Sequence, residues 1–319
     1  MNTLLKNLRE SQNLMKYTPI ILLAILGLGF HIATQGKFGN SRNLMLIFNQ
    51  TIIIATVASG AVFIFGTSNI SIAIGATTSL VATLATLVFL KTDSLGIMLL
   101  VAIASGVVVM LLTALLSLWL KVTVMFVSIV MMILMMAIVQ TILGASTLSI
   151  PYAVTSVLTQ SNFQYIAFII YFLVCAVIFH FTSIGRAIRF IGSNRFCAEQ
   201  TGLYMTKYLL IAFAITGVGA GLSAVMIAIR TGSISFSTAS NLNMDVVLAI
   251  VLGGMSVFGG TRSFIYAGVL GALTVSMLNN GLLMVGISPT ILQLVRGVFF
   301  LTLIVMGQKR PVRLPEKEI

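Results

Sequence analysis

The sequence predicts an all-α polytopic membrane protein with about ten transmembrane helices. Of its 319 residues, 59% are hydrophobic and only 8% are charged, whereas a soluble domain carries about 25% charged residues to solvate its surface. Long apolar runs recur from Pro19 to Met306, each near the ~20 residues with which a helix crosses the hydrocarbon layer. Because these runs lack the alternating pattern of barrel strands, we expect helices.

The apolar runs indicate a single transmembrane domain over residues 1–319, with polar tails at 1–16 and 307–319 and no soluble domain. The segment Gly66-Thr67-Ser68-Asn69 leaves one boundary open, since it could lie within the bilayer or form a turn between two spans. The expected spans are 17–34, 45–65, 71–90, 96–118, 122–145, 163–182, 208–229, 243–258, 264–284 and 289–306.

The basic residues predict the orientation of the chain. With both termini on one side, most of the 18 lysine and arginine residues fall on that side, which the positive-inside rule identifies as the cytoplasm. The net charge of +12 is therefore a topological signal, and we expect the lipid bilayer, not nucleic acid, as its partner. The two cysteines give no disulfide framework.

The loop at 183–207 is the longest polar stretch inside the chain. Within it, Asn194 is a plausible N-cap and Gly202 could supply the left-handed residue that ends a short helix. A short amphipathic helix on the cytoplasmic surface could transmit movement from a soluble partner. The alternative is a positively charged loop that only fixes topology.

Two Gly-Gly pairs, Gly253-Gly254 and Gly259-Gly260, lie near the expected cytoplasmic end of the eighth span. Paired glycines weaken a helix, so they indicate close helix packing or a broken helix. Asp245 is expected near the outer end of the same span. A carboxylate within a membrane segment is functional by default, although an interfacial position would cost little, and both interpretations stay open.

Polar residues also interrupt the apolar region from Phe65 to Gly75, where Asn69 and Ser71 could contact a polar, uncharged solute. Irregular backbone at membrane depth is tolerated where it lines a cavity. The alternative is an ordinary cytoplasmic turn. The Phe-Gly sequences at 65–66 and 258–259 form a weak internal echo, as expected of a duplicated transporter unit.

Several chemistries have no residues to support them. The chain has no phosphate-binding loop of the G-x-x-x-x-G-K-[ST] type, its two histidines lack companion metal ligands, and no ladder of membrane carboxylates suggests an ion pump. We therefore expect no catalytic residue, metal or bound cofactor. Arg296 is the one charge well inside an apolar run, where it could pair with another helix or extend to an interface.

At these residues the chain resembles the permeases of ribose-type sugar ABC importers. The segment from Asp245 through both glycine pairs to Asn279-Asn280-Gly281 is similar to the signature of that family, as is the loop from Gly185 to Gly202. Asn69 stands where the family usually has aspartate. The resemblance is strong over 183–284 and weaker over 110–150, where an expected proline is missing, so the chain looks like a divergent member.

The resemblance implies that 183–207 holds a coupling helix that docks on an ATPase subunit, which binds ATP and magnesium. It also implies an extracytoplasmic solute-binding protein, a second permease copy in a homodimer or heterodimer, and a bacterial plasma membrane location. A monosaccharide such as ribose is the expected solute, and a nucleoside or a branched-chain amino acid is the alternative. An ion-coupled secondary carrier is the alternative class of protein. The implied coupling residues are Gly192, Asn194, Ala198, Glu199 and Gly202. The residue patterns described above predict Asn69, Ser71 and Asp245 as pathway residues, and Gly253, Gly254, Gly259 and Gly260 as residues for helix packing or gating.

Overall fold

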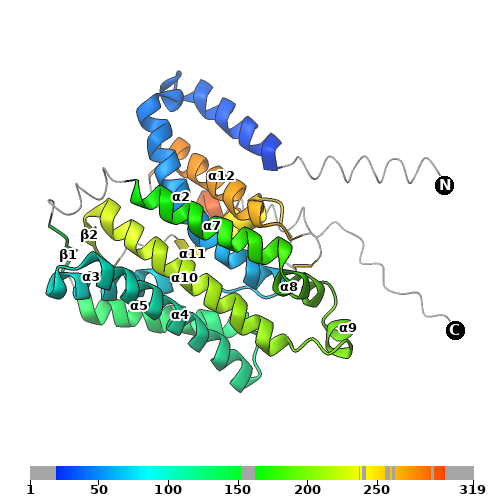
Figure 1. Ribbon diagram of the computed structural model, residues 1–319. Helices are drawn as coiled ribbons and strands as arrows, with labels where there is room; N and C mark the ends of the chain where they lie inside the picture. Colours follow the sequence, from blue (N-terminus) through cyan, green and yellow to red (C-terminus); the bar gives the residue numbers. More distant parts are fainter. Residues whose placement is uncertain are drawn as a thin grey trace, which may run out of the picture.

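The computed structural model is a bundle of long helices, with two short helices at one end and a small strand pair at the other (Figure 1). It describes residues 19–144, 146–151, 162–236, 238, 242–255, 259–260, 263–288 and 291–298. Within this part of the chain, seven helices are long and apolar enough to cross a membrane. The expected all-α polytopic membrane fold is confirmed to this extent.

The seven long helices follow the expected spans closely. They are α2 (Ser41–Gly66), α3 (Ile74–Thr92), α4 (Leu95–Leu120), α5 (Val124–Leu143), α7 (Phe163–Phe181), α10 (Met205–Thr231) and α12 (Ile265–Met284). The shorter elements are the apolar helix Pro19–Ala33, η1 (Lys37–Gly39), β1 (Leu148–Ser149), α8 (Ser183–Ser193), α9 (Arg195–Gln200), β2 (Ser233–Ile234), α11 (Leu242–Leu252) and a helical segment at 291–298.

The expected span at 243–258 is wrong as drawn, because α11 ends at Leu252 in a turn at Gly253-Gly254. At 1.5 Å per residue its 11 residues extend only about 16 Å, half of the ~30 Å hydrocarbon layer. Residues 256–258 of the eighth expected span, and residues 289–290 and 299–306 of the tenth, lie outside the described residues. The broken-helix interpretation of the glycine pair therefore holds at Gly253-Gly254.

Helix α2 lies at the centre of the bundle. Seventeen of its residues are buried, from Ile47 to Gly66, and it packs against α10, α12, α11, α7 and α8. Its hydroxyl groups are satisfied within the helix: Thr51 donates to the carbonyl of Ile47, and Ser59 donates to that of Ala55. Helices α4 and α7 instead expose most of their apolar surface, as expected of helices that face lipid.

Small residues allow α4 and α10 to approach closely. A Cβ added to Gly106 would overlap the carbonyl oxygen of Gly217, and one added to Gly221 would lie 2.6 Å from that of Ala102. In lipid, such close packing replaces the hydrophobic effect as the main attraction between helices. Packed against α4 in this way, α10 runs from one end of the bundle to the other (Figure 1).

Candidate functional site

The expected coupling loop forms two consecutive helices at one end of the bundle, α8 and α9 (Figure 1). Helix α8 was not expected, and it buries one face through Gly185, Ala187, Ile188 and Ile191. Arg189 on its half-buried side lies 5.5 Å from the ring centroid of Phe179. Helix α8 therefore attaches the shorter α9 firmly to the membrane bundle.

Both predicted ends of α9 are confirmed. The side chain of Asn194 accepts a hydrogen bond from the backbone nitrogen of Cys197 at 3.1 Å, which is the N-cap geometry that starts a helix. Gly202 has a φ of +79°, in the left-handed region that ends helices and favours glycine. Asn194 and Gly202 therefore determine where this short helix begins and ends.

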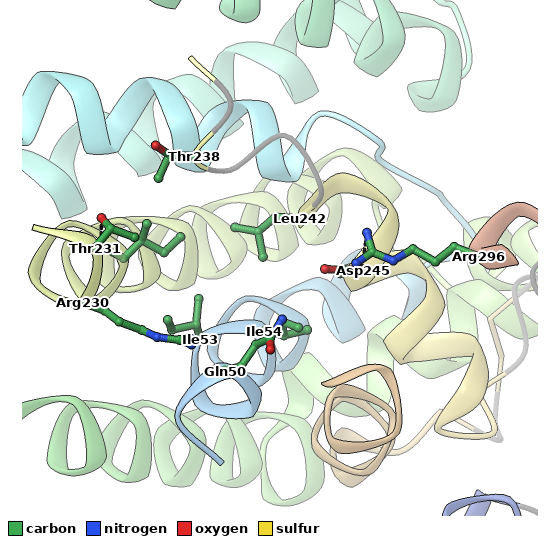
Figure 2. A pocket seen from close by; sticks show the side chains of 10 residues that line it. Gln50, Ile53, Ile54, Arg230, Thr231, Thr238, Leu242, Asp245 and Arg296 are labelled. Atoms are coloured by element: carbon green, nitrogen blue, oxygen red, sulfur yellow. Dashed lines mark hydrogen bonds and ion pairs between the residues drawn. The ribbon is translucent and has the colours of Figure 1, made fainter. Parts of the chain in front are cut away.

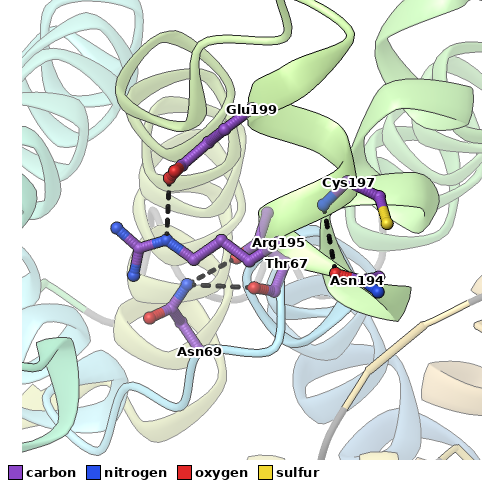
Figure 3. A network of polar contacts seen from close by, with 6 residues as sticks. All are labelled: Thr67, Asn69, Asn194, Arg195, Cys197 and Glu199. Atoms are coloured by element: carbon purple, nitrogen blue, oxygen red, sulfur yellow. Dashed lines mark hydrogen bonds and ion pairs between the residues drawn. The ribbon is translucent and has the colours of Figure 1, made fainter. Parts of the chain in front are cut away.

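Helix α9 presents one buried residue and several exposed ones. Ala198 is buried against the bundle, whereas Phe196 is 70% exposed. Glu199 pairs with Arg195 at 3.1 Å on the surface (Figure 3), where such pairs contribute little stability. An exposed aromatic side chain flanked by polar groups is typical of a protein contact surface.

Three segments that are distant in the sequence meet at the end of α8, and we call their contact the glycine junction: Gly66 at the end of α2, Gly192 in the last turn of α8, and Gly259-Gly260. A Cβ on Gly192 would overlap the carbonyl oxygen of Gly66 and lie 2.9 Å from the nitrogen of Gly260. A Cβ on Gly259 would overlap the carbonyl oxygen of Phe65. Gly259 of the second Phe-Gly sequence is therefore in direct contact with the backbone of the first.

Asn69 and Ser71 belong to the turn that leaves this junction. Asn69 donates to the carbonyl and hydroxyl oxygens of Thr67, at 3.1 and 3.0 Å (Figure 3). The hydroxyl of Ser71 is fully buried and has no hydrogen-bond partner among the described residues. Both residues lie near the end of the bundle that carries α8, and neither lines the cavity described next.

Asp245 lies in the first turn of α11, where it is only 4% exposed, so its carboxylate is buried within the bundle. Its carboxylate forms an ion pair with Arg296 at 3.3 Å. Asn279 of α12 connects the two, because it accepts from Arg296 at 2.9 Å and donates to Asp245 at 3.5 Å. Pairing with another helix is therefore the role that the structure gives to Arg296.

This ion pair forms one end of a cavity of about 290 Å³ (Figure 2). Arg230 and Thr231, at the last turn of α10, form the opposite end, and Gln50 of α2 lies along the side. The walls between them are apolar side chains of Ile53, Ile54, Ile227 and Leu242. The cavity lies toward the β2 end of α10, away from α8 and α9 (Figure 1).

Sequence reasoning missed several groups at the two sites. Phe196 carried a signal, since an aromatic residue in a short polar helix is unusual, but Gln50 and Arg230 looked like ordinary residues near span ends. Gly253, expected to serve helix packing or gating, packs α11 on α12, because a Cβ there would overlap the carbonyl oxygen of Ala267. Gly254 has a φ of +88° and adjoins Pro19.

Comparison with known proteins gives the same class of molecule. Residues 43–306 match the family model of the permease component of the branched-chain amino acid transport system. The ribose import permease protein RbsC of Escherichia coli is 26% identical over 301 residues, which is 91% of this chain and 93% of that protein. The autoinducer 2 import system permease protein LsrC of Photorhabdus laumondii is 26% identical over 87% of this chain and 84% of that protein.

A shorter similarity links the chain to the probable ABC transporter permease protein YphD of Escherichia coli, at 32% identity. It covers 37% of this chain and 35% of YphD, so it spans only about a third of that relative. No solved structure matches the chain. Because the family model spans most of its length, this protein belongs to the family of branched-chain amino acid transport system permease components.

Proposed function

We propose that the chain is the membrane-spanning permease subunit of an ATP-driven, binding-protein-dependent importer, with no ATPase site of its own. The observation that carries this proposal is α9: a helix of six residues, capped at both ends and held by α8, that presents the exposed Phe196 at one end of the bundle. An ATPase subunit that binds ATP and magnesium would dock there. The membership of the permease family supports this role.

The solute is a monosaccharide or a related small polar molecule. The relatives that align along most of the chain are named for the import of ribose and autoinducer 2. An extracytoplasmic binding protein would deliver the solute, and a second permease, either another copy or a related chain, would complete the pathway. Asn69, Ser71 and Asp245 are proposed to contact that pathway, with Asn69 and Ser71 nearer its cytoplasmic end.

About ten membrane segments with both termini in the cytoplasm fit this role in a bacterial plasma membrane. The seven long helices are joined by the helix Pro19–Ala33, the half-length α11 and the segment that includes 291–298. The tails 1–16 and 307–319 then lie on the same side as α8 and α9, which is also where most basic residues fall.

The mechanism is alternating access driven through the glycine junction. ATP-driven closure of the ATPase pair would push α9 and α8, and Gly192 would pass this movement to Gly66 and Gly260. Because backbone touches backbone at these positions, no flexible side chain can absorb the displacement. Packed interfaces of this kind change between discrete arrangements, so Gly259 and Gly260 would act as the gate, whereas Gly253 and Gly254 set the angle of α11.

A pull-down tests the proposal. The tagged chain is purified from native membranes in mild detergent, and copurifying proteins are identified by mass spectrometry. We expect an ATPase subunit, with recovery reduced about 30-fold or more by Phe196→Ala, since a buried aromatic anchor contributes at least ~2 kcal/mol to an interface. Phe126→Ala, which removes an exposed phenylalanine (63% exposed) from α5, is the matched control.

Two results would contradict the proposal. One is recovery of the chain without any ATPase, together with uptake that survives ATP depletion and stops when the ion gradient is collapsed. This result would favour an ion-coupled carrier. The other is equal ATPase recovery with Phe196→Ala and Phe126→Ala, which would move the docking surface away from α9.

A further inference from the structure

The 290 Å³ cavity contains a buried carboxylate whose hydrogen-bonding capacity is only partly used. An ionised carboxylate offers about four acceptor positions. Among the described residues, Asp245 receives the ion pair to Arg296 at 3.3 Å and two contacts of 3.5 Å from Asn279. These distances exceed the usual 2.7–3.2 Å, so the buried carboxylate can accept a shorter hydrogen bond from a group in the cavity.

Two further polar groups of the cavity, on Gln50 and Arg230, are also available. Neither the amide of Gln50 nor the guanidinium of Arg230 makes a hydrogen bond or ion pair with any other residue that the structure describes. Figure 2 shows Arg230 and Thr231 at one end of the cavity and Asp245 with Arg296 at the other. Polar groups at two ends, separated by apolar walls, are typical of a small-molecule site.

We propose that this cavity is a solute-binding site within the single permease chain, and that it selects a small, uncharged, polyhydroxylated solute by accepting a hydroxyl hydrogen bond at Asp245. Asn279 and Arg296 are positioning residues that hold the carboxylate toward the cavity. This inference rests on the proposed transport function, and it adds a site and a recognition chemistry that the family membership does not supply.

The ion pair decides between a polyol and a zwitterion. Arg296 already neutralises Asp245, and Arg230 adds one further positive charge, so the described cavity has a net positive charge. A ligand ammonium would have to compete with Arg296 for the carboxylate and would leave that arginine buried without its partner, which is costly. A hydroxyl group needs only the unused acceptor capacity, and its own oxygen can accept from Gln50 or Arg230.

The size of the cavity limits the solute as well. Cavities that enclose drug-sized ligands occupy about 300–1,000 Å³, and this one lies at the lower end of that range. A single sugar ring fits such a volume better than two. The apolar walls formed by Ile53, Ile54 and Ile227 would cover the carbon face of the ring while its hydroxyls reach the polar ends.

Direct binding to the full-length chain in lipid nanodiscs tests the inference without any transport partner. The probes are D-ribose and L-leucine, observed by saturation-transfer NMR over a concentration series. We expect D-ribose to bind and L-leucine not to bind. Asp245→Asn and Gln50→Leu should each weaken ribose binding about tenfold, because the first replaces a charged acceptor with a weaker neutral one and the second removes a hydrogen bond.

Two further variants separate a cavity effect from misfolding. Ile54→Phe should abolish the ribose signal by filling the cavity, whereas Leu100→Phe, on the exposed face of α4 (70% exposed), should leave it unchanged. The inference is overturned if D-ribose gives no signal, if L-leucine gives the variant-sensitive signal instead, or if Gln50→Leu and Asp245→Asn bind ribose as well as the unmodified chain. Because ATPase copurification is measured separately, these outcomes do not bear on the proposed function.

Discussion

The glycine junction is the part of the molecule where one added carbon atom should separate transport from ATP hydrolysis. In Gly192→Ala, the new methyl group would overlap the carbonyl oxygen of Gly66 and lie within 2.9 Å of the nitrogen of Gly260. Both neighbours are backbone atoms, so α8 as a whole must move away from the bundle. Overpacking of this kind costs about 1–3 kcal/mol.

The helix itself offsets part of that cost. Alanine is favoured over glycine inside a helix by about 0.5–1 kcal/mol. This leaves a net cost of up to about 2 kcal/mol for the arrangement in which α8 packs against the bundle. At 1.4 kcal/mol per factor of ten, this lowers the population of molecules with α8 packed against the bundle by up to about 30-fold. The chain should still fold, because the loss falls on one contact at the end of the bundle.

The assay reconstitutes the complete importer in proteoliposomes and measures solute uptake and ATP hydrolysis together. For Gly192→Ala we expect uptake to fall about tenfold or more while ATP hydrolysis continues, since the ATPase still docks on α9. Gly96→Ala is the control, because a Cβ there would meet nothing beyond its own helix backbone closer than the hydroxyl oxygen of Ser94, at 4.0 Å. Unchanged uptake per ATP in Gly192→Ala would refute the role of the junction.

Three other predictions follow from the same contacts. Asn194→Ala should remove the cap of α9, at a cost of ~1 kcal/mol, and reduce ATPase copurification, whereas Asn194→Asp should retain it; equal losses in both would contradict the capping role. Asp245→Asn should destabilise the purified chain by about 3–5 kcal/mol, measured by thermal unfolding, because it leaves Arg296 buried without a charge partner. The double variant Asp245→Asn with Arg296→Met should recover much of this stability. Additive losses in the double variant would show that the two residues are not coupled. In intact cells a membrane-impermeant maleimide should not label the exposed Cys197 until the membrane is opened; labelling from outside would reverse the proposed orientation.

Most of the fold could be predicted because one physical requirement dominates it. Lipid requires long apolar helices, and the apolar runs locate α2, α3, α4, α5, α7, α10 and α12 with boundaries that differ by only a few residues. The span at 243–258 failed because hydropathy does not distinguish a half-length helix from a full one. Gly253-Gly254 carried the missing signal, since a Gly-Gly pair after a helix of 11 residues allows the turn seen there.

The sites were only partly predictable, because they depend on contacts between distant segments. Asn194 and Gly202 act locally, so their capping roles could be predicted from the sequence. The meeting of Gly192 with Gly66, and the pairing of Asp245 with Arg296, depend on how α2, α8 and α11 pack. No periodicity in the sequence specifies which charged residue will find which partner inside the bundle.

The most direct test of the central claim uses the native cysteine on α9. Cys197 is exposed and Cys175 is buried, so a reagent that joins a maleimide to a short photoreactive group should attach at α9 in membranes that contain the complete importer. After illumination, we predict an adduct between this chain and the ATPase subunit, lost in Cys197→Ser. An efficient label at Cys197 that forms no adduct with any ATPase would contradict the account.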